Sequence, residues 1–272
     1  MNTHRYAFFA ALLVVSAFQP ASAAPDANGY TAQYECRAGN PKCDVDMTPP
    51  PCDVTVYPGD DWSEAIANNP GARSFCMQCG DHRVFGDNNR DQVVLDPSVS
   101  GTASARRWLR YSCPGDNGAH PVQQQPDQRA YAPRFLFMGA DYWILDRLTI
   151  DFDGRDINTA IRFEPDLGSE NNIMNRLLLE DATAHFVQLN YGNANNTLQN
   201  SVVRNPVPTV QFESQCVSVG AGPNFHVVNN EIYNCQKAVS NGNGIVDHPG
   251  LVIENNDLYA TPDVYTDCQG NF

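Results

Sequence analysis

A short pattern that recurs five times in the second half of the chain limits the fold most strongly. Each copy has two apolar residues, a polar position and a second short apolar run, and none of these runs is long enough for a helix. The polar positions recur at a near-constant spacing, and turns between the copies absorb the variation. This spacing indicates one coil of a solenoid per copy. The polar positions are Asp146, Asn175, Asn200, Asn230 and Asn256.

A second apolar column runs between these copies with a similar spacing. Each coil therefore contains three short strand-like pieces separated by polar or glycine-rich turns. An antiparallel sandwich also has many short strands, but it gives no reason for a polar position at near-constant spacing. The pattern favours a parallel solenoid. The second column consists of Ile161, Val187, Val217, Val239 and Val264.

The polar turn followed by a strand resembles the repeat of the right-handed parallel β-helix, or pectate-lyase-like, superfamily, over roughly residues 62 to 272. The resemblance implies an all-β fold with three-strand coils of about 22–30 residues. It also implies a ladder of stacked Asn side chains at the tight turn, because an amide both donates and accepts hydrogen bonds. A total of 27 Asn residues fits such a ladder. The segment Trp62 to Ala67 resembles the N-terminal capping helix of that superfamily.

Residues 1–23 have the three parts of a secretory signal peptide. Arg5 precedes an apolar run over residues 7–18, and Ala21-Ser22-Ala23 forms a small-x-small cleavage signal. The run is too short to cross a bilayer, and no later segment is apolar enough for a membrane span. We therefore expect a secreted protein: signal peptide 1–23, an extended disulfide-rich lead-in 24–54, and the β-helix 55–272. The last coil has only begun when the chain stops at Phe272, so we expect a longer protein.

Nine cysteines fit an oxidising compartment. The six in the N-terminal half are most simply three disulfides, whose 15 connectivities the sequence does not distinguish. Cys216 and Cys235 fall near the same position on neighbouring coils, which predicts a disulfide between them, and Cys268 is left over. The first six are Cys36, Cys43, Cys52, Cys76, Cys79 and Cys113.

The charge of the chain limits its partners. A formal net charge of −14 with only two Lys residues argues against a nucleic-acid partner, because phosphate binding needs a basic face. The superfamily resemblance implies instead that a polysaccharide lies on one outer strand face. The alternation along the second column turns polar side chains outward there. The sequence does not indicate an oligomeric state. The predicted substrate-binding residues on this face are Glu164, Gln188, Asn190 and Ser218.

Acidic residues gather in the turn before this face. Asp151 and Glu180 both lie five places after a ladder position, so they should be neighbours on adjacent coils, within about 5 Å. Like charges at that distance repel unless a cation such as Ca²⁺ lies between them or one carboxyl keeps its proton as a general acid. A solvated acidic turn is the third reading. The predicted metal ligands are Asp151, Asp153, Glu180 and Asp181.

A lyase acting on a uronic-acid polymer needs a base for the proton beside the sugar carboxylate and a cation for the developing negative charge. Lys237 or His185 is the predicted base, and Arg162 or Ca²⁺ the predicted stabiliser. Each of these residues also has an interpretation without a catalytic role. Lys237 would be an exposed lysine in a turn, His185 a turn residue beside a strand, and Arg162 an ion-pair partner of Glu164. The motifs of polygalacturonase-type hydrolases and of pectate lyases are not present in their usual context.

Two functions follow. The first is a polysaccharide-degrading enzyme, a lyase before a glycoside hydrolase. The alternative is a non-catalytic surface, adhesion or carbohydrate-binding β-helix.

Overall fold

The computed structural model describes residues 47–83, 92–116, 118–153, 158–204, 215–220, 222–235, 237–241 and 249–259. The predicted signal peptide and most of the lead-in lie outside these ranges, as do Cys36, Cys43, Val264 and Cys268.

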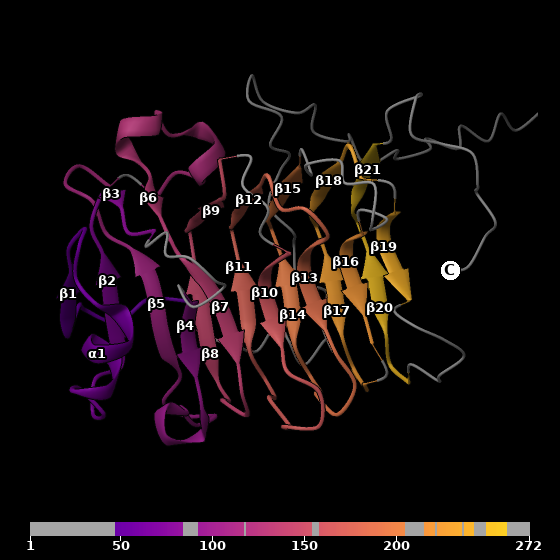
Figure 1. Ribbon diagram of the computed structural model, residues 1–272, viewed down its shortest axis with the longest axis horizontal. Coiled ribbons are helices and arrows are strands. Elements are labelled where there is room, and N and C mark those ends of the chain that lie inside the picture. Colours follow the sequence, from indigo (N-terminus) through magenta and orange to yellow (C-terminus); the bar gives the residue numbers. More distant parts are fainter. Residues whose placement is uncertain are drawn as a thin grey trace, which may run out of the picture.

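The described chain forms three parallel sheets, which it visits in turn (Figure 1). All pairs between the named strands are parallel, so the antiparallel sandwich is excluded and the architecture is that of a parallel β-helix. Sheet A contains β1 (Val54–Val56), β2 (Ser74–Met77), β5 (Arg107–Tyr111), β8 (Trp143–Asp146), β11 (Ile173–Asn175), β14 (Thr197–Gln199), β17 (His226–Val228) and β20 (Val252–Glu254). Sheet B contains β3 (Gly80–Asp81), β6 (Ala130–Tyr131), β9 (Thr149–Asp151), β12 (Leu178–Glu180), β15 (Val202–Arg204), β18 (Glu231–Tyr233) and β21 (Asp257–Tyr259). Sheet C contains β4 (Gln92–Leu95), β7 (Arg134–Phe137), β10 (Thr159–Phe163), β13 (His185–Leu189), β16 (Gln215–Val219) and β19 (Lys237–Asn241).

The core fills the inside of the coil. The predicted apolar column is confirmed, because Ile161, Val187, Val217 and Val239 are partners in register on successive strands of sheet C. These residues belong to one apolar cluster that draws side chains from all three sheets. Burying one such stack per strand face is what holds neighbouring coils together.

A short α-helix, α1 (Trp62–Ala67), packs on the first coil. Asp61 caps its N-terminus by accepting a hydrogen bond from the Glu64 N–H, which satisfies one of the donors that a helix start leaves open. Trp62 and Ile66 are almost fully buried in the main core. A helix this short depends on that packing for its stability.

The polar ladder is present, but the five predicted positions do not form a single column. In register, Asp146 and Asn175 are followed by Gln199, so Asn200 falls one place after the column. Asn200 has a left-handed backbone, and Asn230 follows another left-handed residue, Asn229. The side chains compensate for these shifts: Asn175 donates to Asp146 (2.7 Å), Asn200 to Asn175 (2.8 Å) and Asn230 to Asn256 (2.9 Å).

A second, unpredicted ladder lies at the corner between sheets C and A. The Asn172 Nδ2 donates to Asn196 Oδ1 at 3.1 Å, and Asn172 Oδ1 accepts from the Trp143 N–H. Both side chains are fully buried. The signal was in the sequence, because Asn172 and Asn196 each directly precede a strand of sheet A.

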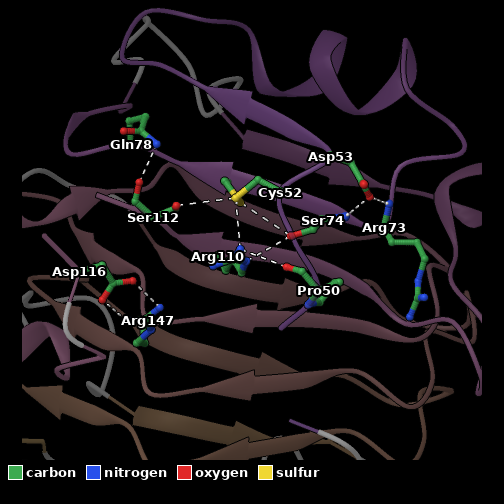
Figure 2. Close-up of a disulfide and its surroundings, with 11 residues drawn as sticks. Pro50, Cys52, Asp53, Arg73, Ser74, Gln78, Arg110, Ser112, Asp116 and Arg147 are labelled. Carbon is green, nitrogen blue, oxygen red and sulfur yellow. Dashed lines mark hydrogen bonds and ion pairs between the residues drawn. A yellow bond between two sulfur atoms is a disulfide. The ribbon is translucent and has the colours of Figure 1, made fainter. Parts of the chain in front are cut away.

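Within the described ranges, three disulfides join Cys52 to Cys76, Cys79 to Cys113, and Cys216 to Cys235, and the last confirms the predicted pair. Figure 2 shows Cys52 beside Ser112 and Arg110. The disulfides fit the predicted oxidising location. Among the helices of the described chain, none has the length and apolar character needed to cross a membrane.

Candidate functional site

A row of polar side chains runs along the outer face of sheet B. Each of four neighbouring short strands turns its middle residue into the core, so its third residue points outward. The strand register places these third residues side by side, one per coil. We call them the axial row: Asp151, Glu180, Arg204 and Tyr233. The predicted neighbours Asp151 and Glu180 are thus confirmed as partners on adjacent coils.

Two arginines converge on Glu180 in this row. The Arg204 Nε donates a short hydrogen bond to the Glu180 carboxylate, and the Arg129 Nη1 lies 3.7 Å from the other carboxylate oxygen. Arg204 also donates to the Tyr233 hydroxyl at 3.0 Å. Burial works against the charge of Arg204, but the Tyr233 and Glu180 contacts outweigh it and raise the pKa of the guanidinium. Two positive groups therefore share one carboxylate.

Asp181, directly after Glu180, has a raised pKa. Burial, the nearby carboxylates of Asp151 and Glu180, and a hydrogen bond with Asp151 raise the pKa of Asp181 to about 6. Burial and nearby negative charge both disfavour the ionised form of the Asp181 carboxyl. Such a group gains and loses its proton near neutral pH, as acid–base catalysis requires.

The raised pKa of Asp181 makes stability depend on pH. The folded pKa of Asp181, about 6, lies above the ordinary value of 3.8, so the folded state holds the proton more tightly than the unfolded state. The resulting stabilisation is complete below about pH 4 and is lost as the pH rises to about 6. We therefore expect Asp181→Asn to gain stability relative to the wild type between pH 4 and pH 7, measured by denaturant unfolding at both pH values. A stability difference that does not change with pH would contradict the raised pKa of Asp181.

Arg83 and Tyr131 extend the site toward the first coils. The Arg83 Nη1 donates to the Asp151 carbonyl at 2.8 Å and lies 3.9 Å from its carboxylate. The guanidinium lies 4.8 Å above the Tyr131 ring and also pairs with Asp81. Partly exposed tyrosines thus stand near both ends of the acidic residues, Tyr131 on one side and Tyr233 on the other. Aromatic bodies with a polar tip suit a ligand that is apolar on one face and hydroxylated at its edges.

The four predicted metal ligands are neighbours, but Glu180 is already bonded to Arg204. In the part of the chain that the structure describes, no three Asp, Glu, His or Cys side chains are arranged to hold a metal ion. Ca²⁺ binding stays an untested prediction, and the chemistry proposed below does not use it.

The outer face of sheet C shows the predicted polar row. Arg162, Gln188 and Ser218 are partners in register, confirming that they share one face. Arg162 is paired with Glu164, with 2.9 Å between Nε and Oε2, and the Asn190 amide donates to the Phe163 carbonyl at 2.7 Å. These contacts engage three of the predicted residues within the protein. Their roles in binding or catalysis stay predictions.

His185 and Lys237, the two predicted bases, begin strands two coils apart in sheet C. Gln215 lies between them in register, so their backbones are separated by roughly 10 Å at the usual strand spacing. Burial lowers the pKa of His185, which favours its neutral form, and its Nδ1 lies 3.4 Å from the Gln215 carbonyl oxygen. A neutral imidazole is able to take a proton, so His185 remains a candidate.

Sequence reasoning gave no role to Arg83, Arg129, Tyr131 or Tyr233. The repeat could have predicted Tyr233, since it lies one coil after Arg204 and occupies the same place in its strand. Arg83 and Arg129 lie in connections outside the repeat, so their positions carry no periodic signal. No family model matches this chain, and neither a curated protein nor a solved structure is significantly similar to it.

Proposed function

We propose that this chain is a secreted, right-handed parallel β-helix of the pectate-lyase-like kind that degrades an extracellular acidic polysaccharide as a lyase. Parallel crossovers within one sheet are almost always right-handed, which supports the handedness. The three disulfides support the secreted location. The observation that carries the reaction is the Asp151–Asp181 carboxyl pair beside two arginines that share Glu180.

In the proposed reaction, ionised Asp181 takes the proton from the sugar carbon next to the carboxylate. The electrons of that C–H bond form a carbon–carbon double bond, and the glycosidic oxygen leaves with its bonding pair and takes up a proton from the protonated Asp181 carboxyl or from water. Negative charge develops on the sugar carboxylate as the proton departs, and a guanidinium stabilises it. Among the described residues, Arg129 and Arg204 both pair with the Glu180 carboxylate, which leaves one of them available for the sugar.

The arginines of the site bear on how an acidic substrate would be bound. A net charge of −14 repels a polyanion at long range. Arg83, Arg129 and Arg204 place positive charge on the face where the sugar carboxylates would lie. Binding at this site should therefore be weakened by salt.

Sheet C offers a second location for the same reaction, with His185 or Lys237 as base and Arg162 as stabiliser. The axial row has more support, because Arg162 is paired with Glu164 while the arginines at Glu180 outnumber their carboxylate. The ion pairs of Arg162, Arg129 and Arg204 engage these side chains within the protein. They therefore also favour the alternative function, a β-helix that binds glycans without cleaving them.

The test is the release of unsaturated products. We expect the purified protein to release them from polygalacturonate, alginate or a glycosaminoglycan, detected by ultraviolet absorbance, and expect Arg129→Ala and Arg204→Ala each to lower the rate about tenfold or more. Exposed Arg73, away from the row, is the control, and Arg73→Ala should not change the rate. Reducing ends without unsaturation would indicate a hydrolase. Binding without any product would indicate the non-catalytic alternative.

A further inference from the structure

The connection between β5 and β6, residues 112–129, lies on the outer face of sheet B. We call it the β5–β6 loop; Asn117 is the one residue of it outside the described ranges. It contains two short helical turns, Pro121–Gln123 and Pro126–Gln128, each begun by a proline whose fixed φ suits that position. His120 and Gln123 close the first turn with reciprocal hydrogen bonds. The loop therefore has a defined shape of its own.

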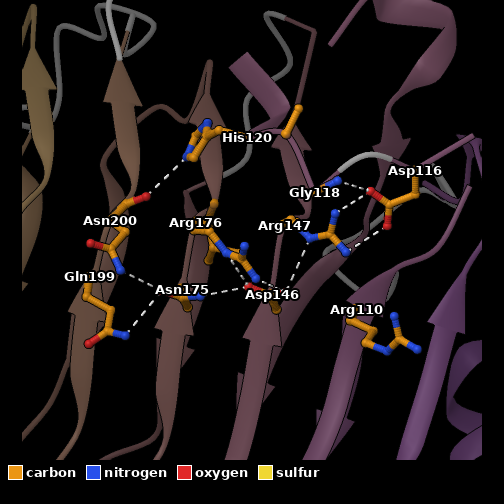
Figure 3. Close-up of polar contacts among 12 residues, drawn as sticks. Arg110, Asp116, Gly118, His120, Asp146, Arg147, Asn175, Arg176, Gln199 and Asn200 are labelled. Carbon is orange, nitrogen blue, oxygen red and sulfur yellow. Dashed lines mark hydrogen bonds and ion pairs between the residues drawn. The ribbon is translucent and has the colours of Figure 1, made fainter. Parts of the chain in front are cut away.

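Three contacts hold this loop along the axis of the coil. At its start, the Asp116 carboxylate forms two hydrogen bonds with Arg147, one of them 2.7 Å long (Figure 3). Further on, the His120 Nε2 lies 3.1 Å from the Asn200 carbonyl oxygen. Val122 then packs on Leu178 and Val202, which are partners in register on β12 and β15. The anchors span successive coils, so the loop runs lengthwise over the sheet.

The loop runs alongside the axial row on the same face of sheet B. Leu178 and Val202 are the first residues of the two strands whose third residues are Glu180 and Arg204. First and third residues of a strand lie on the same face, roughly 7 Å apart. The loop covers the first position and thereby borders the row on one side.

The end of the loop sets the position of Arg129. The Arg129 Nε donates to the Pro121 carbonyl at 3.0 Å, and the Tyr111 hydroxyl donates to the Gln128 carbonyl at 2.7 Å. These contacts hold the guanidinium 3.7 Å from Glu180. The loop thus contributes a charged group to the site as well as a border.

The exposed side chains of the loop are polar. Gln125, Asp127 and Gln128 are exposed beside the row, whereas Gln124 is buried and donates to the Ala119 carbonyl. Exposed amides offer both donors and acceptors, the combination that sugar hydroxyls require. The loop therefore presents exposed hydrogen-bonding groups next to the residue, Arg129, that reaches the axial row.

We propose that the β5–β6 loop determines glycan specificity: it aligns an acidic polysaccharide with the coil axis over the axial row, and Gln125 and Gln128 bind the hydroxyls of the sugars beside the reacting one. This inference rests on the proposed function, because it concerns the same site. In this proposal, the loop selects the length and composition of the oligosaccharide that binds, and the axial row cleaves the bond.

The experiment compares Gln125→Ala/Gln128→Ala with Asn68→Ala, which removes an exposed amide of helix α1. KM, kcat and the lengths of the released products are measured on oligogalacturonates of graded length. We expect the double variant to raise KM about tenfold with kcat unchanged, since the lost contacts bind substrate and transition state equally. It should also shift the product lengths, while Asn68→Ala matches the wild type. Unchanged KM and product lengths in the double variant would overturn the loop's role and leave the lyase standing.

A binding measurement separates the two proposals if no product forms. The same oligosaccharides are titrated by calorimetry into the wild type and both variants. Suppose that the wild type and Asn68→Ala bind equally well and the double variant binds about tenfold more weakly. This result supports the loop's role and rejects catalysis. Equal affinity in the wild type and the double variant, or no binding by the wild type, overturns the loop's role.

Discussion

Asp181→Asn is expected to lower the rate of unsaturated product formation by about 100-fold or more, because it removes the proposed base while keeping its size. For the wild type, kcat/KM should rise with pH, reach half of its maximum near pH 6 and level off about one pH unit higher, following ionisation of the carboxyl whose pKa the protein raises to about 6. The rising limb should be missing from the residual activity of the variant. Oligosaccharide affinity, measured by calorimetry, should change little.

Asp166→Asn is the matched control for this variant. Asp166 is exposed, has the same left-handed backbone that Asn tolerates, and lies in the turn after β10, on another sheet than the axial row. It should keep most of the activity. His185→Ala and Lys237→Ala distinguish the two sheets: if either abolishes product formation while Asp181→Asn does not, the base lies on sheet C and the axial row is not the catalytic site.

The coil could be predicted from the sequence because its apolar columns repeat with little interruption. Ile161, Val187, Val217 and Val239 occupy one stack as expected, since an inward position has no alternative that keeps the core dry. The polar ladder was harder to align. Arg147 and Arg176 occupy left-handed positions that Asn fills in later coils, so counting Asn residues joined neighbouring columns into one.

Only part of the site could be predicted from the sequence, for a related reason. The adjacency of Asp151 and Glu180 follows from the repeat, and the strand register confirms it. The groups that decide what these carboxylates do come from elsewhere. Arg129 reaches Glu180 from a long connection whose course over sheet B depends on Val122 and on the Asp116–Arg147 pair. Contacts of that kind arise from tertiary packing, which no period in the sequence encodes.

Asp146 begins the ladder as a buried charge. Its side chain is fully buried and accepts hydrogen bonds from Asn175 at 2.7 Å and from Arg176 at 2.7 and 3.0 Å, while the Arg147 Nε lies 3.4 Å away (Figure 3). A carboxylate at this place ends a ladder of amides by accepting only, and its charge is matched by the two arginines. A buried ion pair of this kind contributes little net stability, but removing one of its partners is costly.

Asp146→Ala is therefore expected to lower the free energy of unfolding by about 3 kcal/mol, because it leaves the two guanidinium groups and the Asn175 amide without their shared acceptor. The melting temperature should fall by roughly 6–12 °C. Asp146→Asn keeps an acceptor for Asn175 and loses only the charge, so it should cost about half as much. Asp127→Ala removes an exposed carboxylate and should be nearly neutral. Urea unfolding followed by circular dichroism measures all three. If Asp146→Ala were as stable as Asp127→Ala, Asp146 would not link the first coils, and the ladder would depend on its amide hydrogen bonds alone.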